Sequence, residues 1–165
     1  MNMAAAVFYE RIDFGVLPPQ VDALLQKGVL VHRQDRVAAA ELFWQAHALD
    51  HTALPPYLCL YKVLAYQNRV EEARTIAEAG LVEAARQAGW SADWRLWSHS
   101  ASGHAGPERF ALYTLKALAF IALRNNRAED AQAMLAVLGR LDPQGTVGWP
   151  VIATMLESCV NHPPQ

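Results

Sequence analysis

The sequence predicts an all-α fold built from helix hairpins, and three observations predict it. Ala and Leu, which favour helices, supply 29 and 20 of the 165 residues, whereas the β-branched Val, Ile and Thr together supply 22. Apolar residues recur at helical spacing through most of the chain, and Gly and Pro gather mainly between these runs. A third observation is a repeated pattern, in which an Asp or Asn separates two consecutive apolar runs. We therefore expect a single domain over residues 1–165.

The repeated turn pattern occurs three times, at Asp35, Asn68 and Asn126. Asp and Asn tolerate the left-handed backbone conformation that closes a helix, and the residues after them begin a new one. The first two copies begin 33 residues apart and the last two 58 residues apart, a difference of 25 residues. The sequence therefore predicts three helix hairpins, with an insertion between the second and the third.

The expected elements follow from these turns and from the apolar spacing. The first turn of a helix accepts Pro, so Pro55 and Pro56 suit the start of the second hairpin. A frayed tail is the alternative to a short helix over residues 3–14, which would shield the first hairpin. A last helix without a partner is expected to cap the stack. In order, the expected segments are an N-terminal helix or tail (1–16), three repeats (18–51, 54–88 and 108–143), an insertion (89–107) before the third repeat, and a capping helix (147–160).

Small and large residues alternate in these hairpins in a recognisable order. In the third repeat, Leu115 and Ala119 of the first helix are followed by Ala131 and Leu135 of the second, and the repeat closes at Pro143. This order resembles the tetratricopeptide repeat (TPR), a helix hairpin of about 34 residues. The resemblance implies an α-α superhelix, in which the first helix of each hairpin lines a concave face and the second helix lies on the convex face. It also implies a scaffold that binds other proteins.

Sorting the charged residues by expected helix separates the two signs, although the net charge of the chain is only −2. The first helices of the three hairpins, at about 19–34, 56–67 and 108–124, carry six cations and two acids. The second helices, at about 37–50, 70–88 and 128–142, carry three cations and nine acids. We therefore expect a basic concave face and an acidic back.

Helical spacing also selects the side chains on the exposed ridge of each first helix. This ridge interleaves Lys and Arg with Tyr and Phe, a combination suited to a partner segment with carboxylates and apolar anchors. The open alternative is that these are ordinary solvated charges, with aromatic side chains packed beneath a neighbouring segment. The candidate residues of the peptide-binding groove are Leu25, Val29, His32, Arg33, Leu58, Lys62, Tyr66, Lys116, Phe120 and Arg124.

The insertion carries a tryptophan stripe of its own. Trp90, Trp94 and Trp97 recur at helical spacing, and Ser91 is a candidate N-cap for a short helix. One interpretation is a small satellite core on the second hairpin. The other is a binding wall or self-association interface, because exposed tryptophan clusters are unusual on a monomer.

Motifs for other kinds of function are missing from the sequence. A net charge of −2 disfavours a nucleic-acid binder, and no apolar run is long enough for a membrane span. Cys59 and Cys159 are expected to be small buried side chains in a reducing cytoplasm. The pairs His47/His51 and His99/His104 lack the further ligands of a metal site. Without a phosphate-binding glycine loop or a nucleophile elbow, we expect no cofactor, no metal and no enzyme activity.

These observations favour a cytoplasmic, non-enzymatic adaptor whose basic concave groove binds an acidic or amphipathic segment of a protein partner. Two alternatives stay open. Chains with three such repeats resemble type III secretion chaperones for hydrophobic clients, and a homo-oligomeric assembly protein would use the same architecture.

Overall fold

The computed structural model describes residues 11–98 and 104–162, and these residues form helices and connecting turns without a β-strand. The fold class expected from composition and spacing is confirmed. In chain order the elements are α1 (Pro19–Val31), α2 (Arg36–Leu49), α3 (Pro55–Tyr66), α4 (Val70–Ala88), the short 3₁₀ helix η1 (Trp94–Leu96), α5 (Pro107–Arg124), α6 (Ala128–Leu141) and α7 (Trp149–Asn161).

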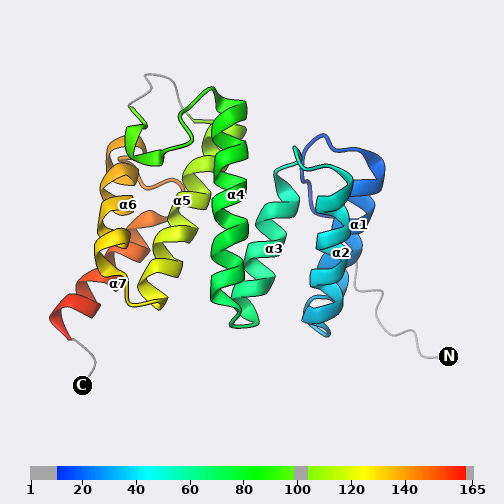
Figure 1. The fold of residues 1–165 in the computed structure, drawn as a ribbon, viewed down its shortest axis with the longest axis horizontal. Coiled ribbons are helices and arrows are strands. Elements are labelled where there is room, and N and C mark those ends of the chain that lie inside the picture. Colours follow the sequence, from blue (N-terminus) through cyan, green and yellow to red (C-terminus); the bar gives the residue numbers. More distant parts are fainter. Residues whose placement is uncertain (1–10, 99–103, 163–165) are drawn as a thin grey trace.

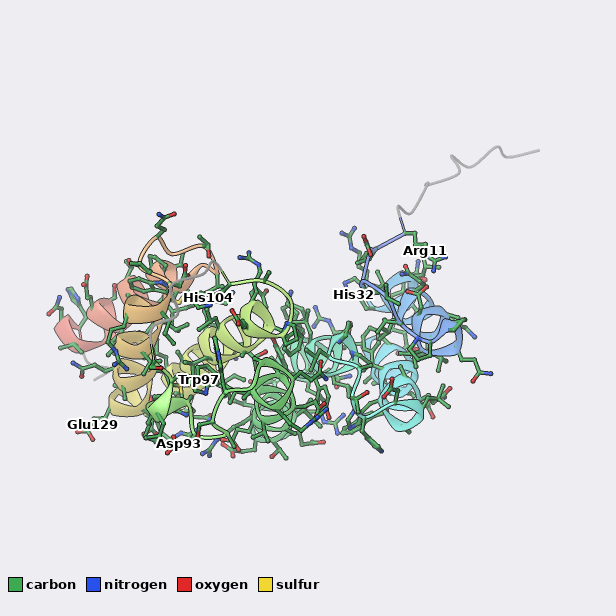
Figure 2. All side chains as sticks on the ribbon, turned by 90° about the horizontal axis from the view of Figure 1, so that it is seen from above. Arg11, His32, Asp93, Trp97, His104 and Glu129 are labelled. Atoms are coloured by element: carbon green, nitrogen blue, oxygen red, sulfur yellow. The ribbon has the colours of Figure 1, made fainter. Side chains whose placement is uncertain are left out.

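The helices stand side by side in a row, as Figure 1 shows. Each α-helix packs against the next one in the chain, and α7 contacts both α5 and α6. Seen along the helices, α2, α4 and α6 lie on one side of the row and α1, α5 and α7 on the other (Figure 2). α3 shares one cavity with α1 and another with α5, so the first helices of the hairpins, together with α7, form one face of the stack, which we call the inner face.

Two of the three predicted turn residues adopt the left-handed conformation. Asn68 and Asn126 have φ values of 60° and 56°, and they end the first helices of the second and third hairpins. Asp35 does not, because it is instead the N-cap of α2 and its carboxylate accepts a hydrogen bond from the Ala38 amide at 2.9 Å. The first turn thus closes by side-chain capping rather than by backbone inversion.

Glycines allow the paired helices to approach closely. In the second hairpin, a Cβ atom at Gly80 of α4 would lie 2.8 Å from the Cβ of Tyr57 in α3. In the first hairpin, a Cβ at Gly28 would overlap the Phe43 ring of α2. Side chains larger than hydrogen at these two positions would force the helices apart.

The prediction of an N-terminal helix over residues 3–14 is wrong for residues 11–14. Residues 3–10 lie outside the described part of the chain, and residues 11–14 are not helical. The Asp13 carboxylate accepts a hydrogen bond from the Gly15 amide at 2.8 Å, and Gly15 has a φ of 83°. This turn directs the chain into Pro18 and the start of α1.

The helix expected in the insertion is reduced to the single turn η1. Gly89, with a φ of 73°, ends α4, and the Trp90 amide donates to the Ala85 carbonyl at 2.8 Å. Asp93, not Ser91, caps the turn, by accepting from the Arg95 amide at 3.0 Å. The three tryptophans therefore have the sequence spacing of a helix, but the backbone between them does not form an α-helix.

None of the helices in the described residues is long and apolar enough to cross a membrane.

Candidate functional site

The inner face carries two adjoining cavities. The first, which we call the α3–α5 cavity, has a volume of about 240 Å³ and is lined by α3, α5 and Ile152 of α7. The second, the α1–α3 cavity, has a volume of about 330 Å³ and is lined by α1, α3, Phe43 of α2 and the chain at Ile12 and Phe14. Together they form a groove along the first helices of the three hairpins.

Most of the predicted groove residues line these cavities. Lys62, Tyr66, Lys116 and Phe120 line the α3–α5 cavity. Lys62 and Tyr66 also line the α1–α3 cavity, so α3 forms the wall that the two cavities share. The remaining predicted residues of the α1–α3 cavity are Val29, His32 and Leu58.

Three predicted groove residues lie elsewhere. Leu25 is fully buried, because it lies on the same face of α1 as Val21 and Gly28, which packs against α2. Arg33 is exposed beyond the end of α1 and lines neither cavity. Arg124 lines a separate hollow between α5 and α7, and its guanidinium donates to the Asn68 side chain at 3.2 Å.

Sequence reasoning missed Tyr113, the residue on which the cations of the α3–α5 cavity converge. Lys116 Nζ lies 3.9 Å and Lys62 Nζ 6.0 Å from the centroid of the Tyr113 ring. Both distances are in the range of cation–π attraction. The signal was present in the sequence, because Tyr113 precedes Lys116 by three residues and Phe120 by seven and therefore shares their helix face.

The cations of this cavity have no carboxylate partner in the described residues. The ion pairs there include neither Lys62 nor Lys116. On the opposite side of the molecule, α4 pairs its own charges, for example Arg74 with Glu78 at 2.9 Å. The inner face thus presents positive charge that nothing in the described chain neutralises.

The acids counted by helix are not all solvated charges. Asp142 is buried, and its carboxylate accepts hydrogen bonds from the Thr146 amide and hydroxyl and from the Val147 amide, at 2.8 to 3.0 Å. Asp142 therefore organises the turn between α6 and α7 instead of adding to an acidic surface. On the inner helices, Asp22 pairs with Arg11 and Glu108 with His104.

The tryptophans of the insertion do not form an exposed patch. Trp94 and Trp97 are 9% and 4% exposed and belong to the main core, and η1 packs on α6. Trp97 Nε1 donates to the Ser91 carbonyl at 2.7 Å, and the partly buried Trp90 packs on the Trp97 ring at 5.0 Å. The interpretation of Trp90, Trp94 and Trp97 as an interface is therefore wrong for the two buried side chains, because the core of the third hairpin already covers them.

The two cysteines differ from each other. Cys59 is partly buried in the wall of the α1–α3 cavity, and burial raises the pKa of its thiol to about 12. Cys159 is exposed on α7, so the expectation that both are buried is wrong for this residue. At this position on the last helix, the Cys159 side chain has no core to pack against.

The histidine pairs have structural contacts. His47 lies in the last turn of α2 and His51 in the turn after it, with ring nitrogens 3.4 Å apart, and burial and the neighbouring His51 lower the pKa of His47. His104 Nε2 lies 2.8 Å from the Leu141 carbonyl and its Nδ1 3.2 Å from Glu108; His99 lies outside the described residues. Within residues 11–98 and 104–162, no group of three or more His, Cys, Asp or Glu side chains is placed to hold a metal ion.

No protein-family model, curated protein or solved structure matches the chain. The likeness to tetratricopeptide repeats therefore depends on the residues of the chain itself.

Proposed function

We propose that this protein is a non-enzymatic, TPR-like scaffold whose inner groove binds an acidic segment of a protein partner. The observation that carries the proposal is the convergence of Lys62 and Lys116 on Tyr113, in an apolar cavity without a neighbouring carboxylate in the described chain. A carboxylate that enters this cavity can form ion pairs with both lysines, and apolar side chains beside it can pack against Tyr66 and Phe120.

The electrostatics of the groove support capture in two steps. The unneutralised cations attract an acidic segment over a distance set by ionic screening, which raises the rate of encounter. Burial of apolar side chains against Tyr66, Phe120 and Ile152 then slows dissociation. A cytoplasmic protein or peptide fits this role, and the groove needs no cofactor for it.

Charge reversal of both lysines tests the proposal. Random peptides displayed on phage are selected on the wild-type protein, and we expect enrichment of Asp or Glu next to Leu or Phe. The selected peptide is then titrated into the variant Lys62→Glu/Lys116→Glu. We expect its affinity to fall by about a hundredfold or more, because two favourable charge contacts become repulsive.

The matched control reverses two exposed cations outside both cavities, Lys27→Glu and Arg140→Glu. This variant has the same net charge as the test variant, so it should bind the selected peptide within about threefold of wild type at moderate salt. Equal loss in both variants, or no loss in either, would show that the cavity is not the binding site.

One observation favours the second candidate, a homo-oligomeric assembly protein. Val151 and Met155, one turn apart on α7, are exposed at 61% and 41%, and Val160 near the end of the helix is exposed at 66%, whereas terminal repeats normally have a polar outer face. A molar mass that rises with protein concentration in light scattering, and falls to the monomer in Met155→Glu, would support this function in place of peptide binding.

A further inference from the structure

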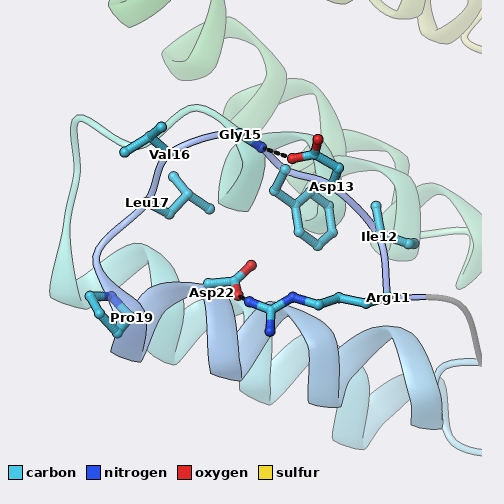
Figure 3. A pocket seen from close by; sticks show the side chains of 9 residues that line it. Arg11, Ile12, Asp13, Gly15, Val16, Leu17, Pro19 and Asp22 are labelled. Carbon is cyan, nitrogen blue, oxygen red and sulfur yellow. Dashed lines mark hydrogen bonds and ion pairs between the residues drawn. The ribbon is translucent and has the colours of Figure 1, made fainter.

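The chain's own N-terminal segment, residues 11–17, lies over the groove at the α1 end. It contains no helix, and it arches over α1 with the Arg11 side chain directed towards Asp22 (Figure 3). The side chains of Ile12 and Phe14 complete the wall of the α1–α3 cavity. Part of the proposed peptide-binding groove is therefore already covered by a peptide segment.

Gln26 of α1 holds the backbone of this segment at one residue. The Ile12 amide donates to Gln26 Oε1 at 3.1 Å, and Gln26 Nε2 donates to the Ile12 carbonyl at 2.6 Å. In the interior of a helix, both of these backbone groups are engaged within the helix itself. The two-point contact therefore recognises a chain that is not helical.

The side chains on either side of this contact form a regular pattern. Arg11 pairs with Asp22, and the Asp22 carboxylate also accepts from Gln26 Nε2 at 3.2 Å, which orients the amide. Ile12 and Phe14 are two residues apart and line the same cavity, as alternate residues of an extended chain do. The α1 end of the groove thus receives a cation, one backbone residue and two apolar side chains.

The segment is held at few points. Phe14 and Leu17 are partly buried against the core, but Ile12 and Val16 are 42% and 104% exposed, and a cavity of about 420 Å³ lies beside the segment. Few buried contacts and exposed hydrogen bonds are the features of a region that opens at low free-energy cost.

We propose that residues 11–17 are an intrachain ligand of the groove, which a partner segment of the same pattern replaces. At the α1 end of the groove, beside Asp22, this partner segment is extended and carries a basic residue, an adjacent apolar residue and a second apolar residue two positions further. Its acidic side chains lie at Lys62 and Lys116 of the α3–α5 cavity. Gln26 is the residue that selects its extended backbone. The inference rests on the proposed function, because it treats the inner face as a peptide-binding groove.

Occupation by the chain's own segment weakens binding of any competitor. A tethered segment acts at an effective concentration in the millimolar range, so a separate peptide of equal intrinsic affinity binds the wild-type protein poorly. Removing the tethered competitor should expose the site. The segment itself supplies the probe, since its sequence is known.

The experiment uses a fluorescein-labelled peptide with the sequence of residues 11–18, RIDFGVLP, and measures its anisotropy with full-length proteins. The release variant Arg11→Ala/Ile12→Asp changes two side chains that are exposed and lie outside the helices, so it should fold as wild type does, which circular dichroism checks. We expect this variant to bind the probe at least about tenfold more tightly than the wild-type protein does.

Adding Gln26→Leu to the release variant should weaken probe binding at least about tenfold, because both backbone hydrogen bonds are lost. The matched control is Gln20→Leu, the same change at an exposed position of α1 that lines neither groove cavity, and it should leave binding unchanged. A second release variant, Ile12→Pro, removes the amide donor to Gln26 and keeps the Arg11 side chain, and it should also bind the probe.

Equal probe binding to wild-type and release variants, absence of binding to both, or insensitivity to Gln26→Leu would each overturn the inference. Failure of the proposed function has a different signature, which is the lack of any effect of Lys62→Glu/Lys116→Glu on a selected acidic peptide. The two results come from different variants and different probes, so they can be told apart.

Discussion

The thiol of Cys59 shows how position in the fold sets the chemistry of a single residue. Cys59 lies in the wall of the α1–α3 cavity, where loss of hydration disfavours the charged thiolate and raises the pKa from 9.0 to about 12, although Lys62 acts in the opposite direction. The exposed Cys159 has no such environment. A cavity that keeps a thiol neutral is suited to apolar contacts and not to nucleophilic chemistry.

We predict that Cys59 resists thiol reagents while the protein is folded. A rise in pKa from 9.0 to about 12 lowers the thiolate fraction at neutral pH by about a thousandfold, and the thiolate is the reactive form. In the variant Cys159→Ser, labelling by a disulfide reagent should be slow in buffer and complete in denaturant. Rapid labelling of the folded variant would contradict the raised pKa of Cys59.

The same shift has a consequence for stability in alkaline solution. The pKa of the folded state lies above that of the unfolded state, so the folded protein retains its proton as the pH rises past the unfolded pKa. The contribution of Cys59 to stability is therefore fully present below about pH 9 and is lost progressively as the pH rises towards 12. Comparing alkaline unfolding of the Cys59→Ala variant with wild type measures this contribution.

At the scale of the helix, close contacts at glycine determine how near two paired helices lie to each other. Gly28 lies where a Cβ atom would overlap the Phe43 ring, whereas a Cβ at Gly139 of α6 would lie 3.7 Å from Trp149, an ordinary contact. Both glycines are inside helices, where Ala is intrinsically favoured by about 1 kcal/mol. The space around each glycine therefore decides whether a Gly→Ala substitution raises or lowers the free energy of unfolding.

We predict opposite effects for the two Gly→Ala substitutions. Gly28→Ala should lower the free energy of unfolding by about 1–3 kcal/mol, because relieving the overlap displaces α1 from α2. Gly139→Ala should raise it by up to about 1 kcal/mol, through helix propensity alone. Chemical denaturation measures both, and a reduced penalty of Gly28→Ala in a Phe43→Leu background would identify the ring as the cause. Equal effects at both positions would contradict this account.

At this scale the sequence predicted much of the structure. Proline and the turn residues place the helix starts within a few positions, because their effects are local, and ridge spacing identifies Lys62, Tyr66, Lys116 and Phe120 as neighbours of one cavity. The burial of Leu25 and the contact between Gln26 and Ile12 were not predictable in the same way. Each depends on how a segment packs on an element distant along the chain, which periodicity does not record.

The whole molecule combines a small net charge with an uneven distribution of that charge. The ion pairs on α4 join its own Arg and Glu side chains, and the buried Asp142 serves a turn, whereas Lys62 and Lys116 face the groove. Charges paired on the back contribute little field at a distance, while unneutralised cations in a concavity focus it. A net charge of −2 is therefore compatible with attraction of an acidic partner.

This distribution predicts that salt acts mainly on the rate of association. Raising the ionic strength from about 0.01 M to about 1 M shortens the screening length from about 30 Å to about 3 Å. We expect the association rate of an acidic peptide selected on the groove to fall at least about tenfold over this range, while the dissociation rate changes less because apolar burial on Tyr66 and Phe120 controls it. Stopped-flow fluorescence measures both rates. The Lys27→Glu/Arg140→Glu variant should retain most of this fall with salt. The Lys62→Glu/Lys116→Glu variant should lose or invert it, because salt then screens a repulsion. The opposite pattern would place the steering charge outside the groove.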